Sequence, residues 1–122
     1  MKSLLAKLGA IFLIVGLMAG SSAVFGADWK EFAEATTGVF RYDATSISSP
    51  SEGLVRVWIN NMTKNETSLV ELKCKDNDYR VLSFVQWDEA YHVRSRQDYP
   101  DADWLQISAK SVPEALCKTL SP

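Results

Sequence analysis

Residues 29–107 alternate between short runs rich in β-branched and aromatic residues and short turn-rich stretches. Runs of this length and composition are typical of strands in a small antiparallel sheet. The runs that predict strands are 29–33, 39–43, 54–59, 69–74, 79–87, 91–96 and 104–107. We therefore expect an α+β fold that is mainly antiparallel sheet.

Alternation within two of these runs predicts which side chains face the core. Side chains two apart along a strand lie on the same face. The inward set is expected to be Val55, Val57, Ile59, Val70, Leu72 and Cys74, and the outward set Leu54, Arg56, Trp58, Leu69, Glu71 and Lys73. A charged turn at 75–78 follows the second run, so this run and 79–87 should form a hairpin.

The end of the chain changes from a strand pattern to a helix pattern. Ser111 and Glu114 form a capping box, in which the Ser hydroxyl accepts from the Glu114 amide and the Glu carboxylate reaches back to the Ser111 amide. Val112, Leu116 and Leu120 recur every four residues and give a short helix one apolar stripe.

Residues 1–26 have the layout of a cleavable signal peptide. Lys2 and Lys7 precede an apolar run, 8–20, and no further charge occurs until Asp28. The run is shorter than the roughly 20 residues that a membrane-spanning helix needs. Small residues allow cleavage after Gly26 or after Ala23. Since no cysteine precedes Cys74, lipid attachment at a lipoprotein leader is excluded. We expect an exported protein that is periplasmic or extracellular. Its single domain is expected at 27–122.

Removal of the leader also changes the charge balance. Eleven of the 13 basic residues and all 15 acidic residues remain, which gives a net charge of −4. This argues against a nucleic-acid or anionic-membrane partner, because both attract basic proteins.

Export to an oxidising compartment lets Cys74 and Cys117 pair, and the disulfide would tie the C-terminal helix to the strand at 69–74.

Several sequence features, in this order and spacing, resemble the surface-adhesin protein E family of small exported bacterial domains. They are Trp29, Tyr42-Asp43 with Ile47, the Val-Arg-Val-Trp run at 55–58, the Leu-Lys-Cys ending at Cys74, Tyr79-Arg80, the Trp-Leu-Gln-Ile run at 104–107, and Ser111 to Cys117. The resemblance implies an antiparallel sheet with a C-terminal helix bound to it by one disulfide. The family takes its name from binding of host surface and matrix proteins.

His92 is the single histidine, so any histidine-based mechanism depends on it. It shares a strand face with Arg94 and Arg96 if 91–96 is extended, and this ladder offers a site for a sulfate, phosphate or carboxylate. A solvated strand face is the expected alternative.

Both cysteines are used in the disulfide and no Gly-x-Ser-x-Gly motif occurs, so we expect no catalytic site and no cofactor.

Asp98, Asp101 and Asp103 bring three carboxylates within one loop. The loop contains Pro100 and lacks the glycine and the closing glutamate of a calcium-binding EF-hand, so we expect an ordinary polar loop and no metal site.

Most of the four tryptophans are expected in the core, because aromatic side chains bury large areas in small sheet proteins. Trp58 is the exception, since it shares its face with Arg56 and is a candidate for partner contact.

The sequence thus favours a non-enzymatic envelope module that binds a protein partner, with homodimerisation through an open edge strand as a further possibility. The alternative is a periplasmic module that binds a small ligand or inhibits an enzyme through His92, Arg94 and Arg96.

Overall fold

A computed structural model describes residues 27–120, and in this range seven strands form one antiparallel sheet that is followed by a helix. The elements are β2 (Trp29–Ala35), β3 (Gly38–Asp43), a 3₁₀ turn (Ala44–Ser46), β4 (Val55–Asn61), β5 (Glu66–Lys73), a second 3₁₀ turn (Cys74–Asp76), β6 (Asp78–Trp87), β7 (Val93–Asp98), β8 (Leu105–Gln106) and α2 (Val112–Leu120). The predicted signal peptide, 1–26, lies outside the described residues. None of the helices in the described range has the length and apolar character needed to cross a membrane.

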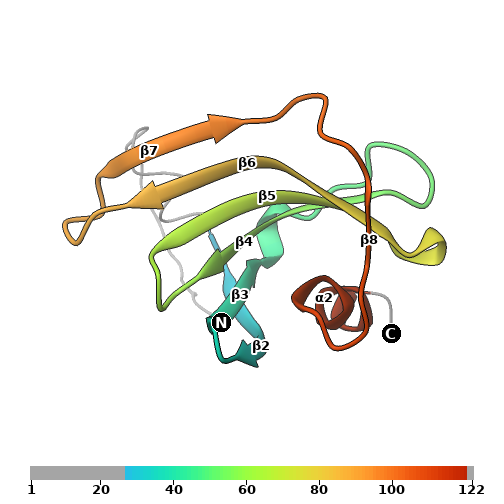
Figure 1. The fold of residues 1–122 in the computed structure, drawn as a ribbon, viewed down its shortest axis with the longest axis horizontal. Coiled ribbons are helices and arrows are strands. Elements are labelled where there is room, and N and C mark those ends of the chain that lie inside the picture. Colours follow the sequence, from blue (N-terminus) through green and yellow to red (C-terminus); the bar gives the residue numbers. More distant parts are fainter. Residues whose placement is uncertain (1–26, 121–122) are drawn as a thin grey trace, which may run out of the picture.

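The strands lie side by side in the order in which they occur in the chain, from β2 to β7, and β8 pairs with the start of β6 (Figure 1). Short connections between antiparallel neighbours produce this meander. The predicted fold class is confirmed: the protein is mainly antiparallel sheet, with a short C-terminal helix that a Cys74–Cys117 disulfide joins to the sheet.

The hydrophobic core lies between one face of the sheet and α2. Its fully buried centre consists of Val57, Val70, Leu72 and Leu116. Val55, Ile59 and Cys74 pack against this centre, as the alternation predicts. Leu116 comes from the helix, and Figure 1 shows α2 lying against one side of the sheet.

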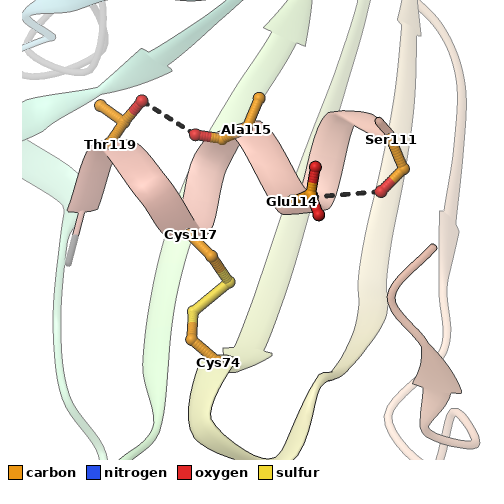
Figure 2. Close-up of a disulfide and its surroundings, with 6 residues drawn as sticks. All are labelled: Cys74, Ser111, Glu114, Ala115, Cys117 and Thr119. Carbon is orange, nitrogen blue, oxygen red and sulfur yellow. Dashed lines mark hydrogen bonds between the residues drawn. A yellow bond between two sulfur atoms is a disulfide. The ribbon is translucent and has the colours of Figure 1, made fainter. Parts of the chain in front are cut away.

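The helix begins at the predicted cap, with one difference. The Glu114 amide donates to Ser111 Oγ at 3.2 Å (Figure 2). The Glu114 carboxylate, however, accepts from the Lys110 amide at 2.9 Å. The prediction that it would reach the Ser111 amide is wrong. Lys110 has a φ of 62°, and this left-handed turn brings its N–H toward the first turn of the helix.

The strand predicted at 91–96 is shifted. β7 begins at Val93 and runs to Asp98, because Tyr91 has a φ of 62° and breaks the extended backbone. Asp88 holds this turn, since its Oδ1 accepts from the Ala90 amide at 2.9 Å and from the His92 amide at 2.8 Å. His92 therefore precedes the strand that was expected to include it.

Candidate functional site

The sheet has a second face, opposite α2, which we call the far face. Its side chains alternate in register with those of the core. The members on which the argument depends are Trp29, Arg41, Arg56, Trp58, Asn60, Leu69, Glu71, Arg80 and Trp87. Within 27–120 no second helix or sheet packs over the far face (Figure 1).

All four tryptophans lie on the far face, and each is half-buried. The prediction that most of them would be in the core is wrong, because the core under a nine-residue helix is small and its fully buried centre consists of aliphatic side chains. The far face instead gives the indole groups polar partners. Trp87 Nε1 donates to Thr67 Oγ1 at 2.8 Å, and the ring of Trp104 has the guanidinium carbon of Arg80 4.4 Å from its centroid.

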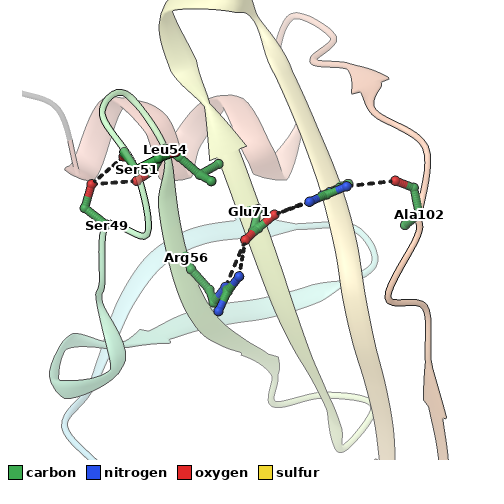
Figure 3. Close-up of polar contacts among 7 residues, drawn as sticks. Ser49, Ser51, Leu54, Arg56, Glu71 and Ala102 are labelled. Atoms are coloured by element: carbon green, nitrogen blue, oxygen red, sulfur yellow. Dashed lines mark hydrogen bonds and ion pairs between the residues drawn. The ribbon is translucent and has the colours of Figure 1, made fainter.

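A buried carboxylate stands at the centre of the far face. Glu71 is fully buried and lies between Arg56 on β4 and Arg80 on β6, its direct partners in the sheet register. Arg56 donates through Nε and Nη2 to Glu71 Oε2 at 2.9 and 2.6 Å (Figure 3). Arg80 donates through Nε to Oε1 at 2.9 Å, and through Nη1 to the Ala102 carbonyl at 3.2 Å.

These contacts determine the charge of Glu71. Burial alone would raise its pKa, but the hydrogen bonds and charges of Arg56 and Arg80 outweigh burial and hold the pKa below its ordinary value. Glu71 is therefore an ionised anchor. It fixes the Arg56 guanidinium, whose side chain is still 41% exposed, at the surface of the far face.

The sequence placed Glu71 on the outward face but did not identify it as a buried charge. A signal was present in the predicted hairpin, because the short turn after Lys73 puts Arg80 directly opposite Glu71. The pairing of Arg56 with Glu71 depends on the register of β4 against β5. The alternation of side chains does not determine this register.

Trp58 lies where the alternation predicts, half-buried on the far face and opposite Leu69. Its backbone amide donates to Ser46 Oγ at 3.0 Å, which ties β4 to the preceding 3₁₀ turn. Trp58 and Arg56 are thus held side by side on one rigid strand.

His92, Arg94 and Arg96 do not form an open ladder. Val93 and Ser95 pair with consecutive residues of β6, so Arg94 falls in a β-bulge that interrupts the alternation. Two of the three have a carboxylate neighbour: His92 Nδ1 is 3.8 Å from Asp88 Oδ2, and Arg96 Nε is 3.1 Å from Asp98 Oδ1.

Both carboxylates stay ionised. The pKa of Asp88 is lowered mainly by the hydrogen bond from the His92 amide, with further contributions that include the charges of His92 and Arg94. The pKa of Asp98 is lowered by hydrogen bonds from Ser83 and Arg96. An added anion would compete with Asp88 and Asp98, so this arrangement does not favour the predicted anion site.

Asp98, the first of the three carboxylates in the acidic stretch, ends β7. Asp98 Oδ1 accepts from Ser83 Oγ at 2.7 Å, and within the described part of the chain no three acidic, histidine or cysteine side chains come together in a metal-binding group.

An apolar hollow lies between the start of α2 and the sheet, lined by residues that include Ile59, Val70, Val81, Val112 and Pro113. Its volume of about 160 Å³ is below the roughly 300 Å³ at which ligand pockets begin. The side facing the helix is therefore a poorer candidate site than the far face.

The sheet ends at β2 on one side and at β7 on the other. β7 is exposed along its whole length and carries a bulge at Arg94, and β2 carries a bulge near Phe32. Bulges and charged residues on edge strands discourage pairing with another chain. Homodimerisation through an edge stays a prediction.

No family model matches this chain, and searches among curated proteins and solved structures found no match either. The resemblance to the surface-adhesin protein E family stays a prediction that depends on the residues quoted for it.

Proposed function

We propose that the protein is a non-enzymatic, exported binding module of the surface-adhesin E type, and that it holds a partner protein on the far face. The observation that carries the proposal is the position of the four tryptophans, all half-buried on the sheet face opposite α2. Tryptophan and arginine are the side chains that most often dominate the binding energy of protein interfaces.

Rigidity also supports this proposal. Arg56 is held by two hydrogen bonds to Glu71, and Arg80 is held by Glu71, the Ala102 carbonyl and the Trp104 ring. Side chains that are ordered before binding lose less conformational entropy when a partner arrives. The far face therefore offers a partner a preformed surface of aromatic rings and guanidinium groups.

The residues that enzymes use as nucleophiles and bases have other roles here. Cys74 and Cys117 are bonded to each other, and His92, with a side chain that is 80% exposed, lies in the turn before β7 beside Asp88. These placements favour binding over catalysis as the proposed function.

The test is affinity capture with the oxidised protein, from envelope extract and from matrix proteins. Trp58→Ser should lose the partner that the unaltered protein captures, with at least a tenfold fall in affinity, because such central aromatic residues contribute about 2 kcal/mol or more. Met62→Ala is the matched control, since Met62 is a large exposed apolar residue that lies in the turn after β4.

Two results would count against the proposal. One is the absence of any partner at micromolar protein concentration. The other is a captured partner whose affinity is unchanged in Trp58→Ser while Met62→Ala weakens it, because binding would then lie away from the far face.

A further inference from the structure

We propose that the groove between the end of β2 and helix α2, which we call the edge groove, binds a short extended peptide segment of a partner by β-strand addition. The edge groove is lined by residues 32–35 of β2 and by one side of α2 with the two residues before it. It lies at the edge of the sheet and not on the far face, so this inference goes beyond the proposed function.

The register of β2 shows which backbone groups the strand leaves open. Among the described residues only β3 pairs with β2, and Glu34 lies opposite Val39. The Val39 N–H donates to Thr63 Oγ1 at 3.3 Å, and its carbonyl accepts from the Met62 amide at 2.9 Å. Val39 thus directs both groups away from β2. Since opposed residues of an antiparallel pair exchange both hydrogen bonds or neither, the N–H and C=O of Glu34 point away from β3.

These two backbone groups identify the occupant. Glu34 is exposed and lines the edge groove, so a ligand can reach them. One donor and one acceptor at the spacing of a single strand residue are matched by the C=O and N–H of another extended chain. Peptides that add a strand to a sheet edge bind through this pairing.

Helix α2 supplies a wall for the side chains of such a peptide. The space between β2 and α2 is about 280 Å³, and its apolar lining includes Phe32, Val112 and Ala115. This is smaller than the roughly 300 Å³ at which pockets for whole small molecules begin. Side chains alternate along an extended chain, so every second side chain of the added segment faces α2. We therefore expect an apolar side chain at the position beside Ala115.

The charges of the edge groove favour a segment without net charge. Its lining contains two carboxylates, Glu34 and Glu114, and two amines, Lys110 and Lys118. Lys118 Nζ is 3.6 Å from Glu114 Oε1, so these two groups already compensate each other.

The shape of β2 limits the length of the segment. The bulge near Phe32 interrupts the regular edge, and β2 ends at Ala35. Regular pairing is therefore confined to residues 33–35. Bulges disfavour long pairing with the strand of a second copy, so the occupant is a short peptide segment.

The probe is a library of random seven-residue peptides displayed on phage and selected on the oxidised protein. Selected peptides are synthesised and titrated by fluorescence anisotropy. Ala115→Phe fills the edge groove, and Glu34→Pro removes an N–H that the sheet does not use. Each substitution should weaken binding at least about tenfold.

Two matched controls accompany these variants. Ala90→Phe makes the same change in the exposed turn before β7, and Glu34→Ala keeps the backbone N–H. Both should bind the peptides with unchanged affinity. Equal weakening by Ala90→Phe and Ala115→Phe would overturn the inference.

Methylation of the peptide backbone tests the pairing without altering the protein. Only alternate amides of an added strand face β2. N-methylation of one alternate set should therefore abolish binding, and N-methylation of the other set should leave it. Hydrogen exchange of the Glu34 amide should slow in the complex. Equal effects of the two methylated sets would refute strand addition even if a protein variant failed to fold.

Trp58→Ser distinguishes the edge groove from the far face. Peptide affinity that is unchanged in Trp58→Ser and lost in Ala115→Phe supports the inference. Peptide binding that is lost in Trp58→Ser and kept in Ala115→Phe overturns it and leaves the proposed function of the far face in place. A library that yields no binding peptide also overturns it.

Discussion

Glu71 is fully buried on a sheet face that no other layer of the described residues covers. Its burial comes from neighbouring side chains, among them the two arginines that bind it. A buried ion pair of this kind adds little stability over a well-packed apolar group, but removal of one partner is costly, because the remaining charge is left without compensation. Glu71 therefore determines the position of Arg56 and Arg80 more than it determines the total stability.

Glu71→Gln should lower the free energy of unfolding by about 2 kcal/mol, because two charge-assisted hydrogen-bonding groups lose their charged acceptor. Chemical denaturation at neutral pH measures this. Glu66→Gln is the matched control on the same strand, where the Glu66 carboxylate accepts from Gln86 Nε2 at 3.3 Å and should contribute less than about 0.5 kcal/mol. Equal losses in the two variants would contradict the anchoring role of Glu71.

The same substitution should alter the pH dependence of stability. The pKa of folded Glu71 lies below 4.5, its ordinary value. The stability that Glu71 contributes is therefore fully present above pH 4.5 and is lost as the pH falls through the folded pKa. Unfolding curves from pH 7 to pH 2 should fall less steeply in the acid range for Glu71→Gln than for the unaltered protein.

Helix α2 is too short to persist alone, since isolated helices below roughly 12 residues are marginal in water. The cap at Ser111 stabilises its first turn, and the Cys117 bond to Cys74 attaches it to the sheet (Figure 2). Leu116 is buried in the core. Of these the disulfide acts on the unfolded chain as well, because it closes a long loop.

The double variant Cys74→Ala, Cys117→Ala should be less stable by roughly 4 kcal/mol, the chain-entropy value for a loop of this length, since the cysteines are 43 residues apart. Thermal or chemical unfolding measures the loss. Reduction of the unaltered protein should reproduce it, whereas Ser111→Ala, which removes only the cap, should cost about 1 kcal/mol. A reduced protein that melts at the same temperature as the oxidised one would refute this account of how α2 is held.

The molecule has two unlike sides. One holds a small apolar core under α2, and the other presents the tryptophans and the Arg56–Glu71–Arg80 group. A sheet covered on only one face normally exposes polar side chains on the other. The half-buried aromatic residues on the far face of this sheet are therefore the main reason to expect a partner there.

The proposed export can be tested on the intact cell. Fractionation should place the protein outside the cytoplasm, with a mass that corresponds to cleavage near residue 26 and to an intact disulfide. Protease added to whole cells then distinguishes the surface, where the protein is digested, from the periplasm, where it is protected. Full-length protein with two free thiols in the cytoplasm would exclude the proposed localisation.

Much of the fold could be predicted from the sequence because it depends on local patterns. Period-two alternation identified β4 and β5 with the correct inward faces, and the Ser111 cap located the start of α2. β7 was less predictable, because the left-handed Tyr91 and the bulge at Arg94 leave no clear signal in residue type. Of the candidate site, the sequence predicted Trp58 with Arg56 on one face and Glu71 on the outward face of the next strand.

The sequence by itself determined the antiparallel sheet with a C-terminal helix, the sides of β4 and β5 that face inward and the pairing of the two cysteines, because these depend on alternation, capping and the number of thiols. Tertiary structure alone decided that Glu71 is a buried charge, that the tryptophans gather opposite the helix, and that Arg41 lies beside Asn60. These follow from the register between strands and from which face the helix covers. Both are set by long-range packing, which no local pattern encodes.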